Sequence, residues 1–284
     1  MNFISKRSVR VFSPVLISWL LVLFSPLAQA LSLEGDFLQG GMVIGQTDPG
    51  DQVKFDGVPI RVSDEGLFLL GFGRDDALQH TLVVRRDGKL AEQRNITIGK
   101  RDYEIQRIDG LPPSKVTPPK RDWKRIKKET AQIKKARKLD DPRADFLGGF
   151  IWPAKGIISG VYGSQRVLNG EPRRPHFGVD VAAPTGTPVY APADGIVTLA
   201  HPDMFYSGGT LIVDHGHKLS SSFLHLSKIL VKVGDRVKQG DLIAEIGATG
   251  RVTGAHLDWR MNLRSARIDP QLLVPPMTVE KPEK

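Results

Sequence analysis

The chain has 284 residues, of which 40% are hydrophobic and 25% charged, as is ordinary for a soluble globular protein of one large or two modest domains. A formal net charge of +9 and a pI near 9.7 suit contact with an anionic polymer or surface, without distinguishing nucleic acid, membrane and cell wall. The sequence has no cysteine, which excludes disulfides, a lipid-modified cysteine and thiolate metal ligands, so any metal must be held by imidazole and carboxylate groups.

Residues 1–30 have the organisation of an export signal. Basic residues near the start precede an apolar run from Val15 to Leu27, and Ala28-Gln29-Ala30 is a small-x-small cleavage pattern. The apolar run is shorter than the roughly 20 residues that a membrane span needs. We therefore expect an exported protein of the periplasm or cell envelope, with no transmembrane span in the mature chain. An uncleaved anchor is the alternative.

Residues 31–100 consist of short alternating segments separated by turn signals such as Asp56-Gly57 and Asp87-Gly88. The predicted strands are 43–45, 53–55, 60–62, 67–72, 81–85 and 95–98. This spacing predicts a small β-sandwich, similar to the immunoglobulin-like modules of exported proteins. His80 stands alone in this region, and we expect it to be a surface residue without a catalytic role.

Residues 101–150 are expected to form a connector. Proline pairs at 112–113 and 118–119 favour extended backbone, and a strongly basic segment, 120–139, follows. Residues at helical spacing in this segment are Trp123, Ile126, Thr130 and Ile133. They predict a helix with one narrow apolar stripe that ends at Asp140-Asp141-Pro142.

Two interpretations of this basic helix remain open. It either binds an anionic polymer or lipid surface, or it is a solvated helix that packs its stripe on a domain. Nucleic acid is not an expected partner, because the export signal removes the chain from most nucleic acid.

Residues 151–275 are expected to form a second domain, followed by a tail at 276–284. Glycine and proline punctuate almost every join, and helical periodicity is nearly absent. The predicted strands are 179–181, 188–191, 195–199, 210–214, 221–224, 230–233, 241–246 and 256–261. This pattern predicts an antiparallel β domain with long loops.

Two histidine–carboxylate pairs in this domain have even spacing. His176 and Asp180 are four residues apart, and His256 and Asp258 are two apart, so in extended strands each pair shares one face. Two such pairs on neighbouring antiparallel strands can converge on one ion. A hydrolytic zinc site usually takes three protein ligands and leaves a position for water.

The other polar candidates in this domain receive structural interpretations. His201 is placed in a loop, and His215 with His217 is expected at a strand-end turn without a metal. Asn169 and Arg173 precede His176 and are candidates to line the cleft.

Six short sequence motifs in this region, taken in order, carry a specific resemblance to a known protein family. They are Pro175–Asp180, Gly186–Gly195, Val213–Gly216, Phe223–Leu226, Val233–Val237 and Gly247–Gly250 continued by His256-Leu257. Residues 151–270 thereby resemble the lysostaphin-type zinc metallopeptidases, which cut peptide cross-links in bacterial cell wall. The resemblance implies an antiparallel β-roll and covers about 40% of the chain, so it leaves residues 31–150 unassigned.

The resemblance also implies roles for individual residues. His176 and Asp180 match zinc ligands, His225 matches a histidine that assists catalysis, and His256 matches the general base. The closing motif of the family is His-x-His, whereas this chain has Asp258 at the position of the third ligand. A His-Asp-Asp set can hold one zinc ion per chain. Its two carboxylates should make the ion a weaker Lewis acid and a harder divalent metal, such as manganese, more competitive.

The sequence thus predicts an all-β protein with an N-terminal immunoglobulin-like sandwich, a basic helical linker and a C-terminal β-roll. The function hypothesis is an exported zinc endopeptidase that hydrolyses cross-links or stem peptides of peptidoglycan. An inactive family member that binds the wall and activates cell-wall amidases, or works with other envelope proteins, is the alternative. A simple wall-binding module is the third possibility.

Overall fold

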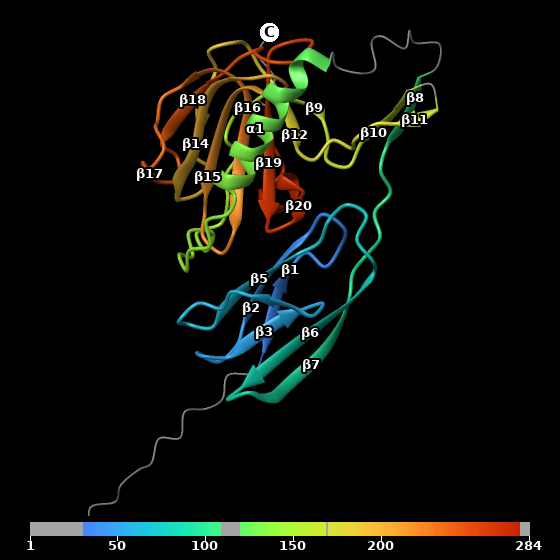
Figure 1. Ribbon diagram of the computed structural model, residues 1–284, viewed down its shortest axis with the longest axis vertical. Coiled ribbons are helices and arrows are strands. Elements are labelled where there is room, and N and C mark those ends of the chain that lie inside the picture. The colour runs from blue at the N-terminus through green and yellow to red at the C-terminus, as the bar shows by residue number, and fades with distance from the viewer. Residues whose placement is uncertain (1–30, 109–119, 169, 279–284) are drawn as a thin grey trace, which may run out of the picture.

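The computed structural model describes residues 31–108, 120–168 and 170–278. The expected export signal, both proline pairs of the connector and Asn169 lie outside these ranges. Within them the chain is built from strands with a single α-helix, so the predicted all-β class is confirmed (Figure 1). No helix in the described ranges has the length and apolar character needed to cross a membrane.

The N-terminal module consists of two small sheets that share one core. One sheet has the order β1-β2-β5 and the other β4-β3-β6-β7. The strands are β1 (Ser32–Gly35), β2 (Met42–Gln46), β3 (Gln52–Phe55), β4 (Val58–Ile60), β5 (Leu67–Gly71), β6 (Gln79–Arg86) and β7 (Lys89–Thr97). Both predicted Asp-Gly turns are present, with φ of 46° and 78° at Asp56-Gly57 and 50° and 75° at Asp87-Gly88. These angles match the two-residue hairpin turns that Asp-Gly favours.

The connector contributes a strand that the sequence did not predict. Strand β8 (Ile105–Ile108) pairs in parallel with β10 (Gln165–Leu168), which also pairs with β11 (Glu171–Pro172). A four-residue strand between proline-rich and charged sequence has no distinctive local pattern. The pairing attaches the connector to the C-terminal module just before His176.

A ten-stranded sheet forms the C-terminal module. Its main path is β17-β14-β15-β16-β19-β12-β9, with β13 paired to β18, β18 to β16, and β20 to β19. The strands are β9 (Ile157–Gly160), β12 (Val179–Ala182), β13 (Pro188–Tyr190), β14 (Gly195–Met204), β15 (Gly208–Asp214), β16 (Leu219–Ile229), β17 (Arg236–Val237), β18 (Leu242–Ile246), β19 (His256–Leu263) and β20 (Ala266–Ile268), with a 3-10 turn at Pro270–Leu273. All pairings in this sheet are antiparallel, as predicted. The strand predicted at 230–233 is wrong, because β16 ends at Ile229 and Val233 is exposed beside the turn at Gly234.

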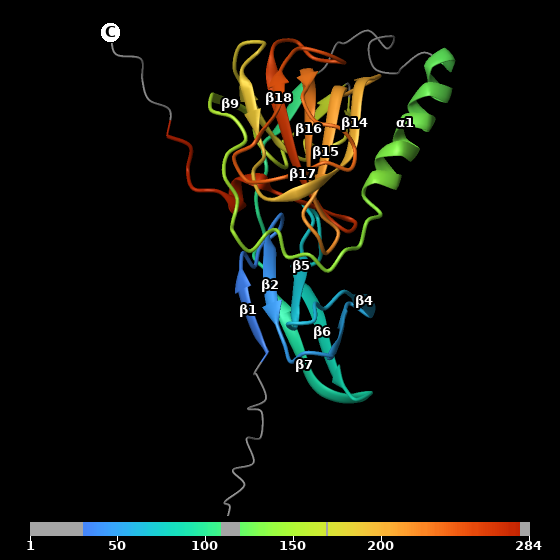
Figure 2. The same ribbon diagram turned by 90° about the vertical axis from the view of Figure 1, so that its left-hand side faces the viewer.

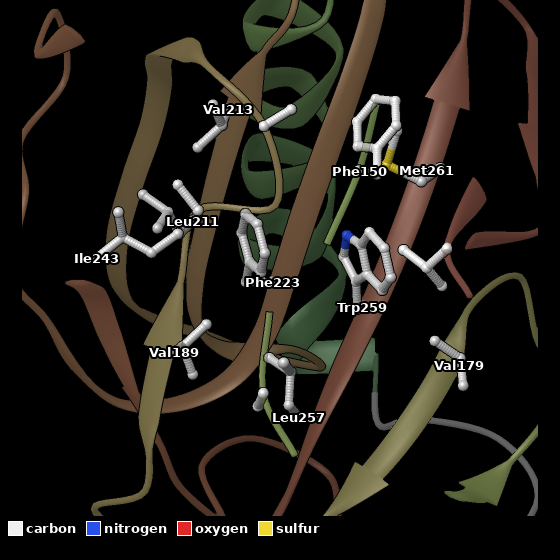
Figure 3. Packing of buried hydrophobic residues seen from close by; sticks show 14 of the residues in the cluster. Phe150, Val179, Val189, Leu211, Val213, Phe223, Ile243, Leu257, Trp259 and Met261 are labelled. Carbon is white, nitrogen blue, oxygen red and sulfur yellow. The ribbon is translucent and has the colours of Figure 1, made fainter. Parts of the chain in front are cut away.

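Strand β19 divides its side chains between the core and the opposite face of the sheet. Leu257, Trp259 and Met261 point into the core, where they lie with Phe223 (Figure 3). Because side chains alternate along a strand, the intervening residues face the other way. The same strand that fills the core therefore presents His256, Asp258 and Arg260 to the site.

The basic helix α1 (Trp123–Ala136), which follows a 3-10 turn at Lys120–Asp122, lies along one face of the large sheet (Figures 1 and 2). Ile133 and Ala136 pack on apolar side chains of β14 and β15. The predicted stripe is partly wrong, because Trp123 and Thr130 are exposed. The helix also ends at Ala136, four residues before the predicted stop. Packing on a domain is therefore the interpretation that the structure supports for this face of the helix.

Glu129 replaces part of the predicted stripe on the buried face of α1. Its carboxylate accepts a hydrogen bond from the backbone nitrogen of Phe205 at 2.9 Å and pairs with Arg125 at 2.7 Å. A buried carboxylate is tolerated when it is paired in this way. The helix is thus fixed to the end of β14 by polar contacts as well as by apolar ones.

The two modules pack together through a shared apolar surface. Leu69 of β5 joins the core of the C-terminal module, and Arg264 donates a hydrogen bond to its carbonyl. Gly71 lies at this contact, and a Cβ at its position would come within 2.8 Å of Leu263 Cδ2, which would then have to shift. An ion pair of 2.8 Å between Arg101 and Asp269 adds to the contact.

A buried histidine in the C-terminal core makes stability depend on pH. His215 lies between the carbonyl of Asp194, 2.6 Å from Nδ1, and the hydroxyl of Ser221, 2.8 Å from Nε2. Burial lowers the pKa of His215 from 6.5 to about 4. The depressed pKa contributes stability that is present above pH 6.5 and lost as the pH falls towards 4. We expect a loss of about 3 kcal/mol over that range.

Urea unfolding at several pH values between 7 and 4 measures this loss. The His215→Gln variant, which cannot titrate, should show a flatter dependence of unfolding free energy on pH. The same slope in wild type and variant would contradict the assignment to His215.

Candidate metal centre

Two carboxylates face each other across neighbouring strands at the centre of the site. Asp180 of β12 and Asp258 of β19 are direct partners in the antiparallel ladder. His176 completes the group, with Nε2 lying 3.1 Å from Asp180 Oδ1. One ligand atom from each of these three residues lies within 4.8 Å of the others. In the described part of the chain, this is the one group of three such residues close enough to hold a metal ion.

His176 does not lie on the same strand as Asp180, although the sequence had predicted that it would. Strand β12 begins at Val179, so His176 and Asp180 do not share the face of one extended strand. His176 instead lies in the preceding loop. Its backbone nitrogen donates to the carbonyl of Ser164, and its carbonyl accepts from the backbone nitrogen of Gly163, both at 2.8 Å. The loop at 163–164 therefore brings the imidazole to Asp180 by contacts that the spacing alone did not predict.

His176 and Asp180 each have a ligand atom without a hydrogen-bond partner, as a cation-binding site requires. His176 Nε2 and Asp180 Oδ1 are both buried, and neither has a hydrogen-bond partner despite their separation of 3.1 Å. Buried polar atoms in native proteins are normally satisfied, so two unsatisfied ligand atoms side by side need an explanation. A divalent ion between an imidazole nitrogen and carboxylate oxygens provides one.

Asp258 is held by an arginine on its own strand. Arg260 donates from Nε to both carboxylate oxygens, at 2.9 and 3.0 Å, and from Nη2 to Oδ2 at 2.5 Å. Burial raises the pKa of Asp258, but Arg260 more than compensates and the net pKa lies below its usual range. Asp258 is therefore an anion whose charge is already shared with a guanidinium.

Two further histidines border the group without belonging to it. The rings of His225 and His256 are 4.8 Å apart, and His256 Nε2 is 3.8 Å from Asp180 Oδ1. Each Nδ1 lies beside a backbone carbonyl, at 2.9 Å for Thr249 with His225 and at 3.0 Å for Gly254 with His256. A carbonyl only accepts, so Nδ1 donates and Nε2 of each ring carries the lone pair.

The backbone at His225 is unusual. Its φ of 65° is in the left-handed region, where residues other than glycine are uncommon. The pairing of β16 with β18 also shifts register just beyond it. Such local irregularities are frequent where a strand redirects a side chain towards a site. Burial lowers the pKa of His225, which keeps its ring neutral at neutral pH.

The remaining histidines are not brought to this site. His80, expected at the surface, is buried and bonded to Asp56 Oδ2 at 2.7 Å. His201, expected in a loop, belongs to β14. His215 and His217 are buried with backbone carbonyls as partners, in keeping with their structural interpretation.

Sequence reasoning missed Arg260, although a signal was present. A residue two positions beyond Asp258 on a predicted strand must share its face, so an ion pair was foreseeable. Arg137 was missed for a different reason. It follows the last residue of α1 and donates to Ser222 of β16 at 2.8 Å, a contact between segments far apart in sequence.

The fold and the site together define the class of protein to which this chain belongs. A β-roll with a His-Asp-Asp group flanked by two imidazoles is the arrangement of a metal-dependent hydrolase. Residues 174–270 match the model of peptidase family M23. A solved structure from Pseudomonas aeruginosa assigned to peptidase M23 is 31% identical, with a TM-score of 0.64, covering 84% of this chain and 95% of that one. The chain belongs to peptidase family M23, a metallopeptidase family, which confirms the predicted resemblance.

Two curated relatives are peptidoglycan DD-endopeptidases of Vibrio cholerae. ShyA is 40% identical over 127 residues, which is 41% of this chain and 29% of the relative. ShyB is 46% identical over 97 residues, which is 34% of this chain and 22% of the relative. The chain therefore spans less than a third of the length of these relatives.

Proposed function

We propose that this protein is an exported, metal-dependent endopeptidase that hydrolyses peptide bonds of peptidoglycan. The observation that carries the proposal is the convergence of His176, Asp180 and Asp258, with the imidazoles of His225 and His256 beside them. Relatives named as peptidoglycan DD-endopeptidases supply the substrate class. Export and a periplasmic or envelope location rest on the sequence of residues 1–30.

His176, Asp180 and Asp258 would hold one divalent ion, most simply zinc. When bound, the ion supplies Lewis-acid chemistry towards water and the substrate carbonyl. Two of the three ligands are carboxylates, and oxygen ligands also suit manganese. Metal identity is therefore part of the test.

The two histidines have separate roles in the proposed reaction. His256 Nε2, beside Asp180, is placed to accept a proton from the attacking water and pass it to the leaving amine. His225, held by Thr249 in the tautomer whose Nε2 is an acceptor, is placed to accept a hydrogen bond from the attacking water and so orient it. The fixed Nδ1 contacts mean that neither ring must reorient during the reaction.

A second candidate function follows from the Arg260–Asp258 ion pair. A carboxylate that already has a bidentate guanidinium counter-ion has less to offer a metal. In that case the chain would bind the wall without hydrolysis and activate a cell-wall amidase or another envelope protein. The N-terminal module, residues 31–100, would then position the partner rather than the substrate.

Metal analysis and digestion of cell-wall sacculi separate the two functions. Purified full-length protein should contain one divalent ion per chain by mass spectrometry. It should release soluble fragments from sacculi, and a chelator should stop the release until zinc or manganese is returned. A metal-free protein that releases nothing, yet stimulates a purified amidase, would establish the second function.

A further inference from the structure

A basic cavity of about 830 Å³ lies between the N-terminal module, the end of α1 and the β19–β20 hairpin. The basic residues that line it are Arg74, Arg137, Lys138, Lys218, Arg264 and Arg267. Three acids line it, and each has a partner: Asp56 pairs with His80, Asp75 pairs with Arg74, and Asp76 accepts a hydrogen bond from the backbone nitrogen of Gly73. Lys218 is likewise paired with Asp140 at 3.2 Å. In the described ranges, none of these acids forms an ion pair with Arg137, Arg264 or Arg267.

Within the described ranges, three lining arginines have no ion pair with an acid. Arg264 donates instead to the carbonyl of Leu69, and Arg137 is the first of the other two. Its Nη2 donates to Ser222 Oγ at 2.8 Å, whereas its buried Nε has no hydrogen-bond partner. Burial and the nearby Arg267 and Arg260 lower the pKa of Arg137 to about 9. The group is still protonated at neutral pH, so a charged donor is held in the cavity wall at a cost in desolvation.

Arg267, on β20, is the second. It donates to Asn262 Oδ1 at 2.7 Å, and its guanidinium lies 6.0 Å from the ring centre of Phe177. Arg174 lies 5.6 Å from the same ring. Burial and the neighbouring Arg174 and Arg260 lower the pKa of Arg267 to about 10. Phe177 directly follows His176, so this side of the cavity adjoins the metal centre.

The cavity and the metal centre lie along one strand. Ser222, the partner of Arg137, is opposite Arg260 in the ladder between β16 and β19. Arg260 lies two residues beyond Asp258, which corresponds to about 7 Å along a strand. An extended peptide with its scissile bond at the metal centre would bring groups two to four residues away to the arginines.

We propose that Arg137 and Arg267 bind a free carboxylate of the substrate peptide and so select the bond to be cut. A guanidinium matches a carboxylate with two parallel hydrogen bonds, and the stem peptides of peptidoglycan carry free carboxylates. A bound carboxylate would satisfy Arg137 Nε and relieve the repulsion among the arginines. This inference rests on the proposed function for the nature of its ligand.

The test uses binding rather than hydrolysis. Full-length protein freed of metal is titrated calorimetrically with a stem peptide that ends in a carboxylate and with the same peptide ending in an amide. We expect the amide to bind at least about tenfold more weakly, because a hydrogen-bonded charge is lost. Arg137→Gln and Arg267→Gln should each reduce this preference. Lys134→Gln, which removes one charge from the exposed face of α1, should retain it.

A conservative variant, competition by inorganic phosphate and digestion of sacculi complete the test. Arg267→Lys keeps the charge but not the planar fork, and should lose much of the preference even if a glutamine variant fails to fold. Equal binding of the two peptides by wild type, or stronger competition by inorganic phosphate than by the carboxylate peptide, would overturn the inference. If the protein digests sacculi but shows no preference for the carboxylate peptide, the inference is overturned and the proposed endopeptidase function stands. If it prefers the carboxylate peptide but hydrolyses nothing, the inference is supported and the proposed endopeptidase function fails.

Discussion

Replacement of Asp180 by asparagine is expected to abolish metal binding and to lower hydrolysis by about a thousandfold or more, equivalent to about 4 kcal/mol of transition-state stabilisation. Asp180 is central to the site, because Oδ1 lies 3.1 Å from His176 Nε2 and 3.8 Å from His256 Nε2. Asparagine keeps the shape of the side chain and removes its charge. The remaining ligands would be one imidazole and a carboxylate that Arg260 already holds.

The measurement is the metal content of the purified Asp180→Asn variant, together with release of fragments from sacculi. Asp203→Asn is a matched control, since Asp203 is exposed and its contact is an ion pair with Arg125. The control should keep both metal and activity. One ion per chain in Asp180→Asn would show that the metal lies elsewhere.

The strands and the opposed carboxylates could be predicted from sequence because their causes are local. Alternation along 256–261 predicts a strand with the core on one side and His256 and Asp258 on the other, and β19 shows that division. The Asp-Gly pairs predict hairpin turns, because aspartate and glycine tolerate positive φ. The six sequence motifs that resemble the lysostaphin-type family, in the same order, then predicted that His176 and Asp180 belong to one site.

The features that could not be predicted depend on contacts between distant segments. His176 reaches Asp180 from a loop held by Ser164, not from a strand. Helix α1 buries Glu129 and exposes Trp123, because the surface that it covers supplies a backbone donor at Phe205. Helical periodicity identifies an amphipathic segment, whereas the partner surface decides which face is buried.

The Arg260–Asp258 pair changes how the departure from the family motif is understood. Exchange of histidine for aspartate adds a negative charge to a buried site, and Arg260 adds a compensating positive charge on the same strand. The net charge of the protein ligands and this arginine then equals that of a site with two imidazoles and one carboxylate. The expected penalty on Lewis acidity from a second carboxylate is correspondingly reduced.

Replacement of His256 by glutamine is expected to slow hydrolysis by about a hundredfold to ten-thousandfold while metal content stays unchanged. His256 contributes no atom to the His176–Asp180–Asp258 group, and Gly254 fixes its Nδ1 so that Nε2 faces Asp180. Glutamine retains a polar side chain but cannot accept and return a proton. His201→Gln is the matched control, because His201 lies on β14 and its Nδ1 accepts a hydrogen bond from the backbone nitrogen of Asp203.

The paired readouts distinguish the two kinds of residue in the site. Asp180→Asn should lose metal and activity together, whereas His256→Gln should lose activity alone. Loss of metal from His256→Gln would make this imidazole a ligand, and would place Asp258 with Arg260 outside the coordination sphere. Undiminished hydrolysis would transfer the proton-accepting role to His225, the neighbouring imidazole at 4.8 Å between ring centres.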